Sequence, residues 1–229
     1  MEKAPEGLEI VQRFFADFTP RQLEQLTALD SLYREWNEKI NVISRKDIDS
    51  LYEKHVLHSL AIAAAFTLKP GMDVIDIGTG GGFPGVPLAI FFPDTRFHLV
   101  DSIGKKLKVV DAVSQAIGLT NITTRHIRAE EIKDRKFDLA VSRAVAPLKD
   151  LMTWSRPLLK KPSRPSDRQR PSALGASPTS DAPSGLICLK GGDLAAEISA
   201  SGARPRIMEV YELFPLEDFR EKYLLQVPY

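Results

Sequence analysis

The chain has little cysteine, no long apolar segment and almost no net charge, and each shortage excludes a class of protein. Its single cysteine, Cys188, cannot form an internal disulfide, so a secreted disulfide scaffold is excluded. No run of about eighteen apolar residues is present, which argues against a membrane-spanning helix. With 31 basic and 30 acidic residues the net charge is +1, so binding to a polyanion would have to rest on local basic clusters.

The first residues also lack the basic segment followed by an apolar run that directs a chain to secretion. Together with the lone cysteine, this predicts a cytoplasmic protein in a reducing compartment. The length of 229 residues suits one domain, nothing in the sequence requires a dimer, and we expect a monomer.

Two regions of the chain differ in their apolar pattern. From about residue 8 to residue 66 apolar residues recur every three or four positions, which predicts helices with a break near 41–47. After Gly71, β-rich runs alternate with helical ones that begin near Pro84, Lys105, Pro147 and Asp193. The predicted strands span residues 73–77, 97–100, 121–124, 137–141 and 186–189.

This alternation predicts a parallel sheet covered on both faces, a doubly wound, Rossmann-like α/β fold. We interpret 1–229 as a single domain with a helical N-terminal extension, 1–68, and an α/β core, 71–229. Residues 207–211 and 223–227 could add two closing strands, antiparallel at the sheet edge. Residues 160–185 are rich in Pro, Ser and Arg and predict a flexible surface loop, either a basic RNA-contacting arm or an insertion without a role.

A glycine-rich loop lies between the first predicted strand of the core and the next helix. Gly78, Gly80 and Gly82 follow the carboxylate of Asp76, and this acidic-glycine pattern is typical of methyltransferases that use S-adenosylmethionine. The spacing of Gly80, Gly82 and a later glycine also matches the dinucleotide fingerprint, so a nicotinamide or flavin enzyme has to be considered. Asp76 favours a cationic sulfonium and would repel a diphosphate, and Pro84 lacks the N–H that a diphosphate would use.

Asp101 ends the second predicted strand and is a second candidate cofactor residue. A carboxylate at this place can accept hydrogen bonds from both ribose hydroxyls of a bound nucleoside. The alternative is a turn or capping residue ahead of the helix near Lys105.

From Leu32 to Gly192, apart from the 160–185 insertion, the sequence resembles the bacterial small-subunit rRNA guanine-N7 methyltransferase family, known as RsmG or GidB. The Gly-x-Pro-Gly and Ser-Arg-Ala pieces separate this family from other methyltransferases. The matching pieces are Trp36-Asn37-x-x-Ile40-Asn41, His55-x-x-x-Ser59-Leu60, Asp76-x-Gly78-Thr79-Gly80-Gly81-Gly82-x-Pro84-Gly85, Asp101-Ser102-x-Gly104-Lys105-Lys106, Arg128-Ala129-Glu130, Ser142-Arg143-Ala144 and Leu189-Lys190-Gly191.

The resemblance implies methyl transfer from S-adenosylmethionine to N7 of a guanine in 16S rRNA of the small ribosomal subunit. It also implies cofactor contacts at Gly78, Phe83, Ala129, Glu130 and Arg143. The chain departs from the family at His58, where relatives usually carry an aspartate, and in the insertion, which replaces a short turn.

Guanine N7 has a free in-plane lone pair, so its methylation needs positioning rather than a general base, and we expect no catalytic triad. Arg143 and Lys190, at the ends of the fourth and fifth predicted strands, are the candidates for the reaction centre. A surface arginine paired with Asp138 or Asp150 is the alternative for Arg143.

Further basic residues follow the second and third predicted strands and are candidate phosphate contacts, although solvated helix faces would explain them too. They are Lys105, Lys106, Arg125 and Arg128. His55 and His58 lie three apart, but no other ligand at suitable spacing completes a site, so no metal is expected. Methylation of another acceptor, or a noncatalytic module that binds S-adenosylmethionine, also fits the sequence.

Overall fold

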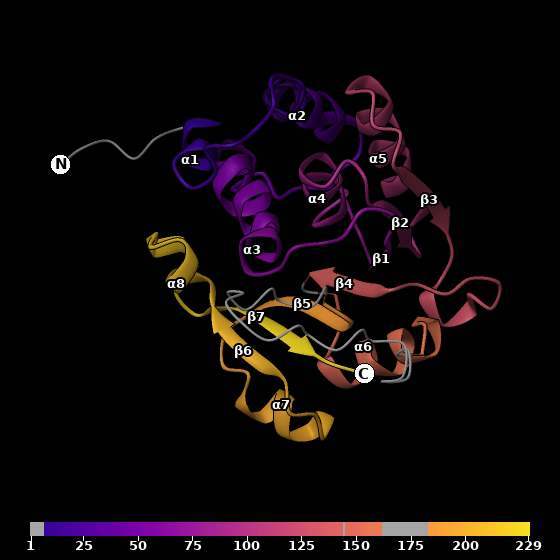
Figure 1. Cartoon of the computed structure of the whole chain (residues 1–229). Coiled ribbons are helices and arrows are strands. Elements are labelled where there is room, and N and C mark those ends of the chain that lie inside the picture. The colour runs from indigo at the N-terminus through magenta and orange to yellow at the C-terminus, as the bar shows by residue number, and fades with distance from the viewer. Residues whose placement is uncertain (1–6, 144, 162–182) are drawn as a thin grey trace, which may run out of the picture.

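The computed structural model describes residues 7–143, 145–161 and 183–229, and its core is a mixed sheet (Figure 1). The strand order is β3-β2-β1-β4-β5-β7-β6. The first five strands in this order are mutually parallel, and β7 runs antiparallel to both neighbours. The strands are β1 (Asp73–Ile77), β2 (Arg96–Asp101), β3 (Ile122–His126), β4 (Leu139–Arg143), β5 (Gly185–Gly191), β6 (Arg206–Glu209) and β7 (Lys222–Val227).

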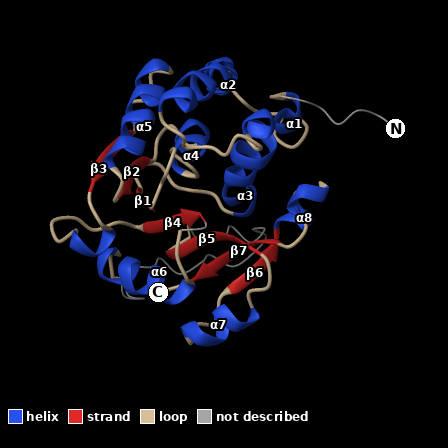
Figure 2. Cartoon of the chain, turned by 180° about the vertical axis from the view of Figure 1, so that it is seen from behind, coloured by secondary structure: helices blue, strands red, loops and turns tan. Residues whose placement is uncertain are grey.

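Helices cover both faces of this sheet, as the two opposite views show (Figures 1 and 2). One face carries α2 (Pro20–Lys39), α3 (His58–Ala65), α4 (Gly85–Phe91) and α5 (Gly104–Ala116), and the other carries α6 (Leu148–Ser155) and α7 (Ala195–Ser201). Short helices α1 (Glu9–Gln12) and α8 (Val210–Leu213) complete the first group. The N-terminal helices share one hydrophobic cluster with the sheet, which includes Leu29, Tyr33, Val74 and Leu99.

The start and end of α2 follow from its sequence. Thr19 and Gln22 form a capping box, with the Thr19 amide donating to Gln22 Oε1 at 2.9 Å, and Pro20 occupies the first turn. After Lys39 the helix ends, and the Asn37 side chain accepts hydrogen bonds from the amides of Val42 and Ile43, at 2.8 and 2.9 Å. These bonds stabilise the non-helical segment that the sequence predicts near 41–47.

The predicted architecture is confirmed, including the two antiparallel closing strands. Two local features differ from the prediction. The helix expected from about residue 47 to residue 66 is divided into a 3₁₀ turn (Ile48–Ser50), a π-helical segment (Tyr52–Leu57) and α3. Val210 begins α8 instead of continuing a strand, because its carbonyl accepts from the Phe214 amide at 2.9 Å and its side chain is buried.

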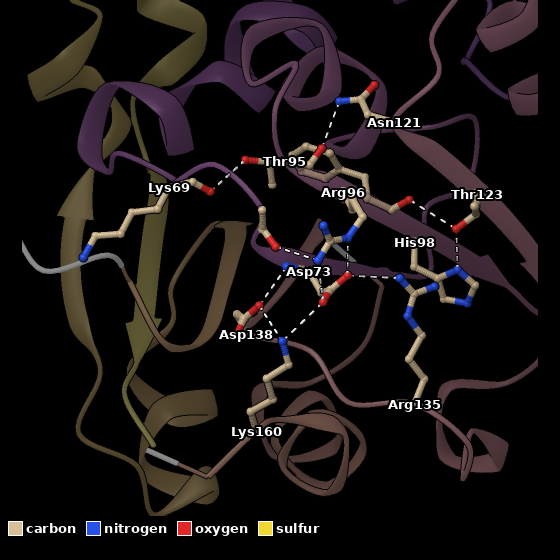
Figure 3. A network of polar contacts seen from close by, with 12 residues as sticks. Lys69, Asp73, Thr95, Arg96, His98, Asn121, Thr123, Arg135, Asp138 and Lys160 are labelled. Atoms are coloured by element: carbon tan, nitrogen blue, oxygen red, sulfur yellow. Dashed lines mark hydrogen bonds and ion pairs between the residues drawn. The ribbon is translucent and has the colours of Figure 1, made fainter. Parts of the chain in front are cut away.

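An ionic network joins the strands at the edge where they begin (Figure 3). Asp73 accepts from Arg96, Arg135 and Lys160 at 2.9, 3.1 and 3.2 Å, and these cations hold its pKa well below the usual range. Lys160 also pairs with Asp138 at 2.8 Å. Lys160, expected as part of a basic arm, is therefore an anchor of the sheet.

The 160–185 insertion leaves and rejoins the fold at this same edge, through Lys160 and the start of β5 at Gly185. Residues 162–182 lie outside the described residues, so the predicted loop and its RNA-contacting alternative stay predictions. Among the described residues, no helix is both long and apolar enough to cross a membrane.

Candidate cofactor and RNA site

The glycine loop connects the end of β1 to the start of α4 and is tied to β2. The amides of Gly78 and Thr79 donate to the Val100 carbonyl at 2.9 and 3.0 Å. Gly82 has a φ of +99°, and a Cβ there would lie 2.7 Å from the Val86 side chain and 3.2 Å from the Tyr33 hydroxyl. Only glycine fits at this position, because both the backbone angle and the space exclude a side chain.

Asp76 is fully buried beneath this loop and stabilises its conformation through two hydrogen bonds. Its Oδ2 accepts from the Thr79 hydroxyl at 2.6 Å and from the Gly85 amide at 2.9 Å. Its Oδ1 is buried and has no hydrogen-bond partner among the described residues, and burial raises the pKa of the carboxyl to about 7. Asp76, expected to contact the cofactor directly, is not among the residues that line the cavities beside the loop.

Two adjoining cavities open at the carboxyl ends of the strands, where ligands of parallel α/β sheets bind. The apolar cavity, of about 90 Å³, is lined by Ile77, Gly78, Val100, Asp101, Ser102, Ile127, Arg128, Ala129, Glu130, Val145 and Trp154. The polar cleft, of about 370 Å³, is lined by Val42, Gly78, Thr79, Gly80, Gly81, Phe83, Asp101, Ser102, Ile103, Lys106, Arg143 and Val145.

Asp101 lies between the two cavities and lines both. Its Oδ2 accepts from the Gly80 amide at 2.9 Å and its Oδ1 accepts from the Ile103 amide at 2.8 Å. Each carboxylate oxygen can accept two hydrogen bonds, so both retain one acceptor position. The residue thus serves as the turn residue of the alternative interpretation and can still receive ribose hydroxyls.

Arg143 ends β4 at the wall of the polar cleft without a carboxylate partner among the described residues. Its guanidinium lies over the Phe83 ring at 5.0 Å and donates to His55 Nδ1 at 2.9 Å and to the Lys54 carbonyl at 3.3 Å. Burial lowers its pKa to about 10, so it stays charged at neutral pH. The alternative pairing with Asp138 is not seen, since that carboxylate binds Lys160.

His55 supports Arg143 as a neutral acceptor. Because Nδ1 accepts the arginine hydrogen bond, the ring proton is assigned to Nε2, which is buried and has no partner in the described ranges of the chain. Burial lowers the pKa of His55 to about 3. His58 is also buried, beside the Phe219 ring at 5.7 Å. In the described part of the chain no group of three or more His, Cys, Asp or Glu side chains could hold a metal ion.

Lys190 is placed differently from the expectation of a cation projecting toward the reaction centre. It is 8% exposed, pairs with Glu197 of α7 at 2.5 Å and donates to the Ala146 carbonyl at 2.5 Å. Glu197 also accepts from the Leu148 amide at 2.6 Å. The pair therefore anchors the segment between β4 and α6, and Lys190 lines neither the apolar cavity nor the polar cleft.

The four candidate RNA residues divide in the structure. Lys106 lines the polar cleft, Lys105 is exposed beside it, and Arg128 lines the apolar cavity. Arg125 instead pairs with both oxygens of Asp134 at 3.0 Å, which satisfies its charge locally.

Sequence reasoning missed Val42 and Trp154 as lining residues. Apolar side chains carry no chemical signature in a sequence, and only the fold brings these two to the cavities.

The residues present fit S-adenosylmethionine. An apolar cavity suits the adenine, Asp101 has acceptor positions for the ribose, and the polar cleft offers the arginine and loop backbone for the charged amino acid end. The fold and this site define an S-adenosylmethionine-dependent methyltransferase. The chain aligns with the structure of a SAM-dependent methyltransferase from Aquifex aeolicus at TM-score 0.52 and 15% identity, covering 81% of this chain and 98% of that one.

The family follows from sequence comparison. The chain belongs to the rRNA small subunit methyltransferase G family (GidB), whose model matches residues 22–164. A relative from Parabacteroides distasonis, named ribosomal RNA small subunit methyltransferase G, is 52% identical over 219 residues, 96% of this chain and 88% of the relative. A relative of the same name from Bacteroides thetaiotaomicron is 51% identical over 215 residues, 94% of this chain and 97% of the relative.

Proposed function

We propose that this protein transfers a methyl group from S-adenosylmethionine to N7 of a guanine in 16S rRNA of the small ribosomal subunit. Family membership supports the reaction and the substrate class. We also expect it to act as a monomer in the cytoplasm, where ribosomal subunits are assembled.

The observation that carries the proposal is the charged Arg143 at the wall of the polar cleft, whose hydrogen-bond acceptors among the described residues are both neutral. A buried cation whose hydrogen-bond acceptors in the described part of the chain are neutral favours an anionic ligand, either the carboxylate of the cofactor or an RNA phosphate. The Phe83 ring and the loop glycines line the same cleft, beside which the target base would lie in this proposal.

The chemistry asks little of the protein beyond placement. The sulfonium supplies an electrophilic methyl group when the cofactor is bound. We propose that Asp101 holds the ribose, that Ala129 and Glu130 contact the adenine in the apolar cavity, and that Gly78, Gly80 and Phe83 hold the rest of the cofactor. Gly82 lines neither cavity and would act by shaping the loop. Orientation of this kind is worth up to roughly 7 to 11 kcal/mol in well-aligned systems.

The other two candidates act indirectly in this scheme. Asp76 would set the shape of the glycine loop through its bonds to Thr79 and Gly85. Lys190 would position the segment that carries Val145 at the cleft, through its pair with Glu197.

The test is methyl transfer from labelled S-adenosylmethionine to 30S subunits purified from cells that lack this gene, with the product identified by nucleoside mass spectrometry. A 7-methylguanosine product in 16S rRNA is expected. Binding of the cofactor without transfer to the subunit would overturn the proposed substrate and favour another acceptor or a noncatalytic module.

A further inference from the structure

Two exposed cations on a segment next to the polar cleft, Arg45 and Lys46, have no assigned role so far. Lys106 of α5 lines the cleft, and Val42 lines it as well, from the connection between α2 and the 3₁₀ turn at Ile48. We refer to residues 41–47 as the 41–47 loop. Arg45 and Lys46 of this loop are exposed, and neither forms an ion pair with another described residue.

Hydrogen bonds from α2 and within the segment itself support the 41–47 loop. The Asn37 side chain accepts from the amides of Val42 and Ile43, and its Nδ2 donates to the Ile43 carbonyl at 2.9 Å. The Ser44 hydroxyl donates to Asp47 at 2.6 Å, and the Asp47 amide donates to the Ser44 carbonyl at 3.0 Å. A preformed loop loses little conformational entropy when it binds a partner.

The loop is also packed against the site itself. A Cβ built on Gly81 would lie 2.9 Å from the Val42 Cβ, so loop and glycine turn are in close contact. The Lys54 side chain pairs with Asp47 at 3.1 Å, and the Lys54 carbonyl accepts a hydrogen bond from Arg143 at 3.3 Å. Arg45 and Lys46 therefore belong to a segment tied to the reaction centre.

Two acidic residues close to these cations in sequence pair with other basic residues. Asp47 pairs with Lys54, and Asp49 pairs with Arg34 at 2.8 Å. With Arg45, Lys46 and Asp47 as its charged residues, the 41–47 loop carries a net positive charge, and Val42 of this loop and Lys106 of α5 both line the cleft. Cations on two segments that both contribute to a cleft suit the negative charge of a nucleic acid backbone.

We propose that the 41–47 loop is an RNA-binding rim, in which Arg45 and Lys46 hold backbone phosphates opposite Lys105 and Lys106 and so keep the target nucleotide over the cleft. This inference rests on the proposed function in taking RNA as the substrate. Phosphate contacts of this kind position the strand and carry no sequence preference.

The test compares the double variant Arg45→Ala/Lys46→Ala with the matched control Arg204→Ala/Arg206→Ala. The control removes two exposed cations near the start of β6, at the sheet edge away from the cleft. Affinity for a fluorescent 16S rRNA transcript is measured by anisotropy over a range of salt, methyl transfer to unmodified 30S subunits by steady-state kinetics, and S-adenosylhomocysteine binding by calorimetry.

The double variant should bind the transcript roughly tenfold or more weakly at about 0.1 M salt. Its slope of log affinity against log salt should be smaller by about 1.4, since each lost phosphate contact to a single strand contributes about 0.7. KM for the 30S subunit should rise while kcat and S-adenosylhomocysteine affinity stay at the wild-type values. The control should match the wild type in every assay.

Transcript affinity and salt slope equal to those of the control would overturn the proposal. Weakened S-adenosylhomocysteine binding in the double variant would overturn it as well, because the loop would then act by shaping the cofactor site. If the wild type methylates no 30S subunit but the double variant alone loses transcript binding, the proposed function fails and the RNA-binding rim stands.

Discussion

Replacing Asp101 by alanine should remove two sets of hydrogen bonds at once. Within the protein, the amides of Gly80 and Ile103 lose their acceptor, which lies at 2.9 and 2.8 Å. Toward the cavities, the remaining acceptor positions for the ribose hydroxyls are lost too. A hydrogen bond to a charged group contributes about 1.5–3 kcal/mol, so one lost ribose bond should raise Kd roughly 10- to 140-fold.

The two effects can be separated with two ligands, S-adenosylhomocysteine and its 2′-deoxy analogue, measured by calorimetry. The wild type should bind the deoxy analogue more weakly, and Asp101→Ala should bind both equally. Asp193→Ala is the matched control, because Asp193 also accepts an amide two residues on, from Ala195 at 2.9 Å, but lines neither cavity. Continued discrimination between the ligands by Asp101→Ala would refute the ribose contact and leave only a role in the loop.

Three more predictions concern buried or aromatic groups around the cavities. Trp154 lines the apolar cavity, and the chain has 2 tryptophans. S-adenosylhomocysteine should therefore change the tryptophan fluorescence of Trp36→Phe but not that of Trp154→Phe. A fluorescence change in Trp154→Phe would contradict the placement of Trp154 at the cofactor. His55→Leu should lower kcat roughly tenfold or more, since the buried guanidinium of Arg143 loses an acceptor. His55→Asn should recover part of the lost activity, because its side-chain amide offers an acceptor. Equal rates in both variants would show that His55 is not a positioning residue. Burial raises the pKa of Asp76 to about 7, above about 3.9 in an unfolded chain, so its contribution to stability is present below pH 4 and lost as pH rises through 7. The wild-type melting temperature should fall more than that of Asp76→Asn between pH 6 and 8, and parallel melting profiles would argue against the shifted pKa.

The fold could be predicted because its signals are local. Short β-rich runs that alternate with helical ones indicate a parallel sheet, and the glycines after β1 mark the turn at its carboxyl end. The same kind of pattern also predicted the two closing strands near the C-terminus. The differences are local: the helix expected after residue 47 is divided into three pieces, and at Val210 burial and a hydrogen bond from Phe214 favour a helical turn over a continued strand.

The candidate site was harder to predict, because a residue's partner depends on contacts between segments that are distant in sequence. From the sequence, a lysine at the end of a strand is expected to be a free cation. In the structure, Lys190 forms an ion pair with Glu197 of α7. Asp76 belongs to the glycine motif, but its side chain points under the loop, toward the Gly85 amide. No pattern of residue types encodes these directions.

The N-terminal helices and the segment after them support the polar cleft, even though their apolar pattern separates them from the α/β core. Tyr33 of α2 donates to the Gly81 carbonyl at 2.7 Å, and His55 accepts from Arg143. Every acceptor that Arg143 has among the described residues is neutral, a carbonyl and an imidazole beside an aromatic ring. A carboxylate in place of His55 would neutralise the guanidinium within the protein. Neutral acceptors fix its orientation and leave its charge available to an anionic ligand, so the helical extension determines the electrostatics of the cleft as well as its shape.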